Sequence, residues 1–297
     1  MTSKGKIQFE FGKDCNKSVE IGEFKWTAKE NSECDSVSCP GKCTLLKCAP
    51  LGDSPTVLWQ CLARGTLNLA DSSGSKQATF HVWNFHFDRW HGTAHLHRSD
   101  SSYTSAQSVC ATKSFGQIQI EILESTIVDL SQPDNSLIQD TEDAAKFKIG
   151  DKEMWLSKKT LSFYSPFFHN LFAKNSGKQK GDPYELKDLF IESFILFLYI
   201  IHDVPTQLDR ISAGLLLYMG DMFKCKKVLQ RCEEFLQNAD VEEIPLSEKF
   251  LLADRYKFNK LLLKTVDKMS INELKSLSRS GMSEFALDVV LQKVFSI

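Results

Sequence analysis

Residues 158–172 read KKTLSFYSPFFHNLF, and this stretch says more about the fold than any other part of the chain. Ser165 precedes Pro166, and a serine N-cap followed by proline at the first helical position typically begins an α-helix. Apolar side chains then recur with the spacing of one helical face, at Phe167, Phe168, Leu171 and Phe172. The stretch predicts a helix whose aromatic face is mostly core.

The flanking sequence predicts a small α+β unit. Before the helix, two short apolar runs at 147–149 and 154–156 flank Gly150-Asp151-Lys152, which is typical of a hairpin turn. After it, Tyr184-Glu185-Leu186 could form a short strand, and helices are expected near 190–201, 208–220 and 225–237. In the last of these, apolar residues keep the i, i+3, i+4 spacing of an amphipathic helix.

The C-terminal part contains a weak internal repeat. Residues 215–229 resemble residues 250–262 at an offset of 33, with Asp221 aligned on Asp254 and Phe223 on Tyr256. Each copy predicts a helix, a tight turn and a second helix, as in stacked helical hairpins. Ser270-Ile271-Asn272-Glu273 is a capping box, and an amphipathic helix is expected to follow it.

The N-terminal part has the alternating pattern of β-strands. Turn-rich breaks at 52–55, 71–74 and 99–102 separate the runs. Seven or eight short strands at this spacing predict an antiparallel sandwich or barrel. The expected strands lie at 7–11, 43–49, 57–62, 66–69, 78–87, 94–96, 105–110 and 117–123.

Residues 143–238 resemble a BTB/POZ domain in the order and spacing of their motifs, and the helices after them resemble the 3-box or BACK extension of cullin adaptors. The resemblance implies self-association and engagement of cullin-3. It rests on Phe147-x-Ile149, Lys158-x-x-Leu161, Ser165-Pro166-Phe167-Phe168, Leu171-Phe172, Tyr184 to Asp188, Phe194 to Ile200, Leu215-Leu216, Gly220-Asp221-x-Phe223, Val228, Cys232-Glu233 and Phe235-Leu236.

A β-rich domain before a BTB domain resembles the MATH-BTB architecture, in which a MATH sandwich captures a protein substrate. Phe24-Lys25-Trp26 and the run from Leu58 to Leu62 are similar to MATH segments. The expected architecture is therefore multidomain, and its parts are a MATH-like antiparallel β-sandwich at 1–125, a linker at 126–142, an α+β BTB/POZ domain at 143–238 and a short helical extension at 239–297.

The segment after the aromatic helix is the candidate partner-binding site. Cullin adaptors often carry a hydrophobic-x-Glu motif here, whereas this chain has Ser176-Gly177-Lys178. It also has Ser157-Lys158 where the family usually has His-Lys. The missing motif leaves open an alternative, a BTB dimer that is a scaffold or regulator without cullin. The candidate cullin-facing residues are Phe172, Lys174, Asn175, Ser176, Gly177 and Lys178.

Charge and hydropathy limit the classes of partner that we expect. The 297 residues carry 36 Lys+Arg and 38 Asp+Glu, a formal charge of -2. Neither half is basic, so nothing indicates nucleic-acid binding. The longest apolar run, Phe194 to Ile201, is far shorter than the roughly 20 residues that span a bilayer, and the N-terminus lacks a signal-peptide core. We expect no membrane association, residence in the cytosol or nucleus, and cysteines that are free thiols.

Two side-chain clusters could hold a metal, but their spacing favours ordinary roles. The cysteine cluster lacks the close CxxC pairs of zinc knuckles, and the histidines alternate with aromatic residues as on a strand. Cys61 or Cys110 with a nearby histidine would be needed for hydrolase chemistry, and no motif supports it. We expect no catalytic residue, no metal and no cofactor. The clusters are Cys34, Cys39, Cys43 and Cys48, and His81, His86, His91, His95 and His97.

These expectations converge on a non-enzymatic adaptor. Its N-terminal domain would bind an unknown protein substrate, its BTB domain would form a homodimer, and its helical extension would support a cullin-3 scaffold.

Overall fold

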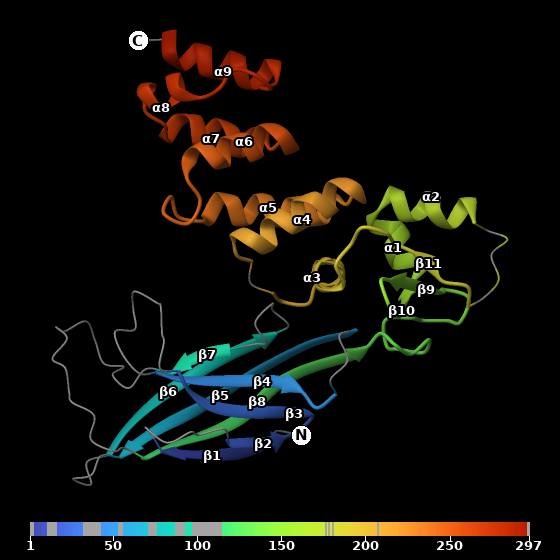
Figure 1. Cartoon of the computed structure of the whole chain (residues 1–297), viewed down its shortest axis with the longest axis vertical. Coiled ribbons are helices and arrows are strands. Elements are labelled where there is room, and N and C mark those ends of the chain that lie inside the picture. Colours follow the sequence, from blue (N-terminus) through green and yellow to red (C-terminus); the bar gives the residue numbers. More distant parts are fainter. Residues whose placement is uncertain are drawn as a thin grey trace. The chain divides into compact units, whose positions relative to one another are not determined.

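The chain folds into two compact units, Met1–Ser131 and Gln132–Ile297 (Figure 1). The computed structural model describes residues 3–10, 17–31, 43–52, 56–70, 76–86, 93–96, 115–175, 177, 179, 181–206 and 208–295.

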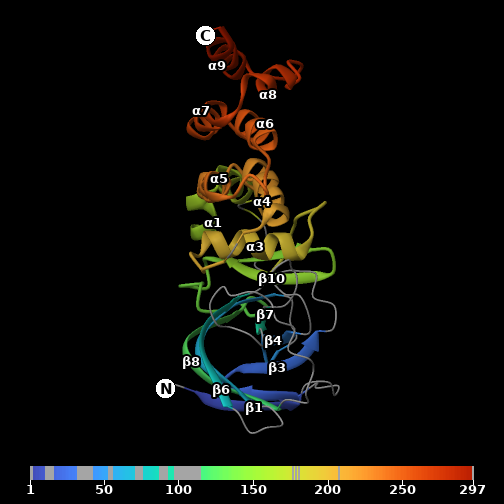
Figure 2. The same ribbon diagram turned by 90° about the vertical axis from the view of Figure 1, so that its left-hand side faces the viewer.

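The described part of the first unit forms two antiparallel four-stranded sheets. The first sheet has the order β1-β8-β5-β6 and the second has the order β2-β3-β4-β7. Figure 2 shows the first sheet curving around the second. The strands are β1 (Lys4–Glu10), β2 (Lys17–Ile21), β3 (Phe24–Asn31), β4 (Cys43–Pro50), β5 (Val57–Ala70), β6 (Lys76–His86), β7 (Thr93–Leu96) and β8 (Phe115–Asp129).

One core lies between the two sheets. Successive strand residues point to opposite faces, so every second side chain is buried. Trp26 of the second sheet meets Phe85 of the first edge to face, with ring centroids 5.3 Å apart, and Phe24 lies 5.9 Å from Trp59. All four rings are buried in the same cluster. The predicted antiparallel sandwich is confirmed.

The strand boundaries differ from the expected ones in three places. The two expected strands at 57–62 and 66–69 are parts of one strand, β5, and Gly65 lies within it. A Cβ on Gly65 would come 2.1 Å from the carbonyl oxygen of Gln119, so the glycine permits close strand packing and marks no turn. The β2–β3 hairpin was not predicted, and β8 continues to Asp129, past the expected end of the sandwich at residue 125. The expected strand 105–110 lies outside the described residues.

The second unit begins with the predicted hairpin. β9 (Ala144–Ile149) pairs with β10 (Lys152–Ser157) around Gly150, whose φ of 60° suits glycine. The short strand β11 (Tyr184–Glu185) adds to β9 in parallel.

Five helices follow the hairpin, and the apolar run of the sequence becomes the most deeply buried one. Every residue of α3 from Ser193 to Ile201 is buried. None of the helices among the described residues has both the length and the apolar character needed to cross a membrane. The helices are α1 (Lys158–Tyr164), α2 (Pro166–Lys174), α3 (Ile191–Ile201), α4 (Arg210–Met222) and α5 (Lys226–Asn238).

The remaining helices continue as stacked hairpins, as the repeat predicts (Figure 1). At equivalent positions 33 apart, Lys224 and Lys257 both have a left-handed backbone, with φ of 55° and 60°. Each is followed by the same hydrogen bond, from the N–H of Cys225 to the Gly220 carbonyl and from the N–H of Phe258 to the Ala253 carbonyl, both 2.8 Å. The helices are α6 (Leu246–Tyr256), α7 (Asn259–Lys268), α8 (Ile271–Ser276) and α9 (Glu284–Phe295).

Candidate partner-binding surfaces

The candidate site lies at the C-terminal end of α2. Phe172 is half-buried there, and its ring packs 5.2 Å from Tyr184 and 6.1 Å from Phe147. Lys174 is exposed at the last position of the helix. The two predicted residues therefore differ in their surroundings. Phe172 packs the helix against the β-strands, whereas Lys174 faces solvent.

Asn175 ends this helix. Its backbone N–H donates to the carbonyl of Phe172 at 3.2 Å, and its Nδ2 donates to the carbonyl of Leu171 at 2.7 Å. These bonds satisfy two carbonyls that the last turn would otherwise leave open. Gly177 is exposed, whereas Ser176 and Lys178 lie outside the described residues. The loop thus begins from a fixed helix end.

The start of α1 is organised by a buried carboxylate. Ser157 donates its hydroxyl to Asp143 Oδ2 at 2.6 Å and accepts from the N–H of Thr160. Asp143 Oδ1 accepts from the N–H of Lys159 at 2.7 Å. The serine found in place of the usual histidine is therefore a helix cap joined to the chain that precedes β9.

Ser165 connects the predicted helix start to a distant helix. It caps α2 by accepting from the N–H of Phe168, and its hydroxyl donates to the carbonyl of Phe223 at 2.5 Å. The ring of Phe223 packs 4.8 Å from that of Phe168. The buried Ser165 hydroxyl therefore links the start of α2 to the C-terminal end of α4, beside the aromatic core.

The phenylalanine stripe of α1 and α2 contains both core and surface. Phe168 is fully buried, Phe167 and Phe172 are half-buried, and Phe163 is 81% exposed. Phe190, just before α3, is also 76% exposed. Large exposed aromatic rings are typical of protein interfaces. Phe163 and Phe190 are accordingly interface candidates.

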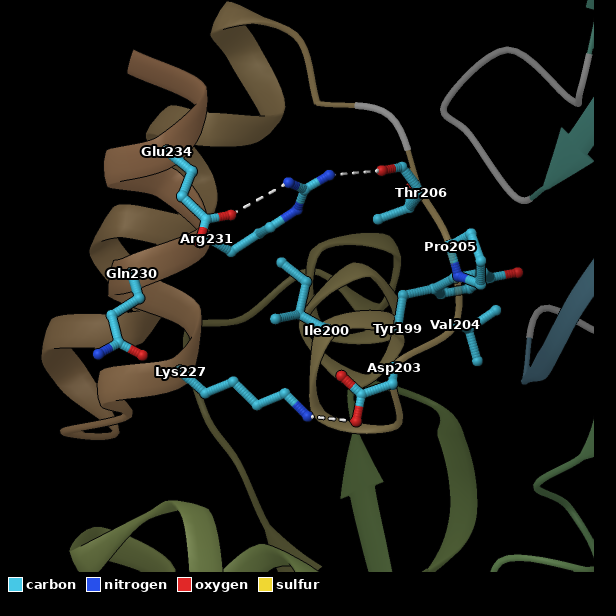
Figure 3. Close-up of a pocket in the computed structure, with 10 residues that line it drawn as sticks. All are labelled: Tyr199, Ile200, Asp203, Val204, Pro205, Thr206, Lys227, Gln230, Arg231 and Glu234. Atoms are coloured by element: carbon cyan, nitrogen blue, oxygen red, sulfur yellow. Dashed lines mark hydrogen bonds and ion pairs between the residues drawn. The ribbon is translucent and has the colours of Figure 1, made fainter. Parts of the chain in front are cut away.

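A polar pocket of about 360 Å³ lies between the end of α3 and α5 (Figure 3). Lys227 Nζ reaches Asp203 Oδ2 at 2.7 Å and also donates to the carbonyl of Ile201 at 3.0 Å. Arg231 pairs with Glu234 at 3.3 Å. Both cations are paired with carboxylates within the pocket, and Lys227 also caps a carbonyl at the C-terminal end of α3.

The metal and thiol clusters are only partly within the described residues. Cys48 is buried in the sandwich against Cys61, and burial raises the pKa of its thiol above the ordinary range. His81 stacks on Trp83 with ring centroids 5.7 Å apart, as expected for a strand histidine beside core aromatics. Among the described residues, no group of three or more metal-binding side chains comes together. Cys34, Cys39, His91, His97 and Cys110 lie outside them.

Sequence reasoning missed an exposed face on the helical hairpins. Tyr218 of α4 and Leu251 of α6 occupy equivalent positions of the repeat, and they are 52% and 55% exposed. The repeat at an offset of 33 residues aligns these two positions, but helical periodicity alone does not show which apolar side chains remain exposed to solvent.

Comparison with known proteins identifies one domain and one similar protein. Residues 141–240 match the BTB/POZ domain. Most of the chain is also similar to BTB and MATH domain-containing protein 38 of Caenorhabditis elegans, with 23% identity over an alignment of 308 residues that covers 93% of this chain and 73% of that protein. The chain therefore contains a BTB/POZ domain at residues 141–240, and it resembles a MATH-BTB protein over almost its whole length.

Proposed function

We propose that this protein is a non-enzymatic adaptor that recognises a protein substrate through its N-terminal sandwich, self-associates through its BTB/POZ domain and engages cullin-3. The observation that carries the proposal is the BTB/POZ domain followed directly by stacked helical hairpins. The similarity to a protein named for both BTB and MATH domains supports the two-part division of labour. We place the protein in the cytosol or nucleus.

The mechanism is proximity. A substrate held by one domain and a ligase scaffold held by the other share a high effective concentration, so reaction on the substrate speeds up without new contacts. The buried thiols of the second unit suit this passive role. Burial raises the pKa of Cys232 to about 12, which keeps its thiol protonated and unreactive at neutral pH.

Exposed Phe163 supports self-association of the BTB/POZ domain. We expect Phe163→Ser to weaken the dimer of the full chain, because an apolar ring that leaves water in the dimer would be lost. His169→Ser, at an exposed position of α2, is the control for a surface change nearby. Light scattering of both variants at several concentrations measures the effect, and an unchanged dimer in Phe163→Ser would contradict it.

The segment after α2 provides the sharpest test of cullin binding. Immunoprecipitation of the tagged full chain from cells should recover cullin-3, and failure to recover it would overturn the ligase assignment. Ser176→Leu with Lys178→Glu introduces the hydrophobic-x-Glu pattern that this chain lacks. This double variant should bind the cullin-3 amino-terminal region more tightly than the natural chain.

The second candidate function is a BTB scaffold or regulator without cullin. The sequence Ser176-Gly177-Lys178 favours it. Both functions predict a dimer, but the scaffold predicts that the natural chain does not bind the cullin-3 amino-terminal region.

A further inference from the structure

The first sheet of the sandwich has an outer face that carries both charge and exposed apolar side chains. Two cross-strand rows form it. In one row Lys4, Glu121, Arg64 and Val82 lie opposite one another on β1, β8, β5 and β6. In the next row Lys6, Gln119, Thr66 and Phe80 do the same. We call this surface the outer face; its charged and apolar members are Lys4, Lys6, Arg64, Phe80, Val82 and Glu121.

This face points away from the core because strand side chains alternate. Ile118, Ile120 and Ile122 of β8 are buried between the sheets, so Gln119 and Glu121 project to the other side. The surface is hollowed over these rows, with a volume of about 420 Å³.

The charges on the outer face are unbalanced. Glu121 pairs with Lys4 Nζ at 3.2 Å and with Arg64 Nε at 2.8 Å. Lys6 has no ion-pair partner among the described residues, so three cations face one carboxylate. The hydrogen bonds from Arg64 and Lys4 lower the pKa of Glu121, which therefore stays ionised and continues to hold both partners.

Arg64 is oriented in advance for an incoming acid. Its bond to Glu121 uses Nε, which leaves both Nη groups for another acceptor, and its side chain is 48% exposed. A guanidinium held on one edge loses little freedom when it binds a carboxylate through its terminal nitrogens.

Apolar side chains flank these cations. Phe80 is 66% exposed and Val82 is 61% exposed, although both are on a strand whose other face is in the core. Phe80 contributes to the wall of the hollow together with Lys6 and Arg64. Exposed apolar rings beside polar groups mark interaction surfaces.

We propose that the outer face is a docking site for an acidic segment of a protein partner in which apolar residues lie next to Asp or Glu. The carboxylates would bind Lys6 and the free Nη groups of Arg64, while an apolar side chain would cover Phe80 and Val82. The proposal rests on the proposed adaptor function, for which it names a substrate-binding surface and the chemical class of the substrate segment.

The charge of the face argues against two other occupants. A symmetric dimer through this face would bring two positively charged surfaces together, because a two-fold interface uses the same patch on both copies. A nucleic acid needs an extended basic surface, whereas this one has a carboxylate at its centre and belongs to a chain of net charge -2.

A random peptide library displayed on phage and selected on the purified full chain tests the proposal. The selected peptides should be enriched in Asp or Glu adjacent to apolar residues, and a labelled synthetic copy of one should bind the full chain. Raising the salt from about 0.1 M to about 1 M should weaken binding, since the Debye length falls from about 10 Å to about 3 Å.

Variants locate the binding on the outer face. Lys6→Glu and Phe80→Ser should each weaken the peptide roughly tenfold, because one removes a charge contact and the other an apolar contact. Lys47→Glu, a charge reversal on the outer side of the second sheet, is the matched control and should leave affinity unchanged. Lys6 and Phe80 are exposed and Lys47 is partly exposed, and unchanged melting curves would show that all three variants fold.

The proposal is overturned if no binding peptide is selected, if the selected peptides lack acidic residues, or if Lys6→Glu binds as tightly as the natural chain. Cullin-3 binding by the Lys6→Glu chain is measured in parallel. Retained cullin binding with unchanged peptide affinity would overturn the docking site alone, whereas the adaptor function fails only when cullin is not bound.

Discussion

The two units of the molecule bury their side chains in different ways. The sandwich is stabilised by alternating apolar side chains that pack between its two sheets. This core also contains the indole N–H of Trp26, which has no acceptor among the described residues. The second unit also has an apolar core, but polar side chains in addition close its helix ends. Lys293 of α9, for example, donates to the carbonyls of Val266, Asp267 and Met269 at 2.6–2.9 Å.

This difference indicates where each unit tolerates change. A pattern of alternating apolar residues leaves the outer faces of a sheet free to vary, which suits recognition of a substrate. Specific side chain to backbone bonds fix the relative positions of helices, which suits a platform for self-association and scaffold binding. Four sets of variants test this difference between the two units.

The largest effect should come from the aromatic core of the second unit. Phe168→Ala removes a fully buried ring that packs against Phe147 and Phe223, and we expect a loss of about 3–5 kcal/mol of unfolding free energy. In a chain that also carries Trp155→Phe, the remaining tryptophans all lie in the first unit. Urea unfolding followed by circular dichroism at 222 nm should then shift, while the tryptophan fluorescence should not. Phe295→Ala, at an exposed position of α9, should cost little. Equal shifts in both signals would show that the units unfold as one.

A comparison of two serine N-caps measures how much the buried hydrogen bond from Ser165 to the Phe223 carbonyl stabilises the second unit. Ser165→Ala loses both the cap of α2 and the bond to the Phe223 carbonyl, so we expect a cost of about 2–3 kcal/mol. Ser270→Ala loses only the exposed bond that the serine hydroxyl accepts from the Glu273 N–H, worth about 1 kcal/mol. Chemical unfolding of both variants gives the two values. Similar costs would mean that the connection to α4 adds nothing.

His202 makes the second unit sensitive to acid. Burial lowers its pKa to about 4, with Lys227 adding to the effect and Asp203 opposing it. The unfolded chain takes up a proton near pH 6.5 and the folded chain does not, so stability falls as the pH drops from about 6.5 to about 4. His202→Gln should flatten this part of the stability profile, measured by unfolding at several pH values. An unchanged slope would contradict the prediction.

The smallest effect should come from the surface contact between α4 and α6. Arg210 binds Glu248 through Nε at 3.2 Å and through Nη2 at 2.6 Å, but both side chains are partly exposed. A double-mutant cycle with Arg210→Ala and Glu248→Ala should give a coupling below about 1 kcal/mol that shrinks with salt. A larger coupling would mean that this pair fixes the hairpins together.

The helical unit was predictable because its signals are local. Ser165-Pro166 begins α2 and the Ser270 capping box begins α8, as both motifs require. What could not be read were the left-handed turns at Lys224 and Lys257. Glycine or asparagine usually occupies such positions, so lysine carries no turn signal there.

The sandwich was predictable in class but less so in detail. The glycine at 65 resembles a break until the neighbouring strand shows why no side chain fits there. Strand alternation identified 78–87 as a strand, but it does not reveal that Phe80 and Val82 are on the uncovered side. Which face is buried depends on pairing with strands far away in the sequence, and this is why the outer face was not among the predicted sites.

The most direct measurement is light scattering of the purified full chain, alone and mixed with the amino-terminal region of cullin-3. We expect a mass of twice 33.7 kDa for the chain alone, and a heavier species that contains one cullin fragment for each chain when the fragment is added. A monomer that forms no complex with the fragment would contradict the proposed adaptor function.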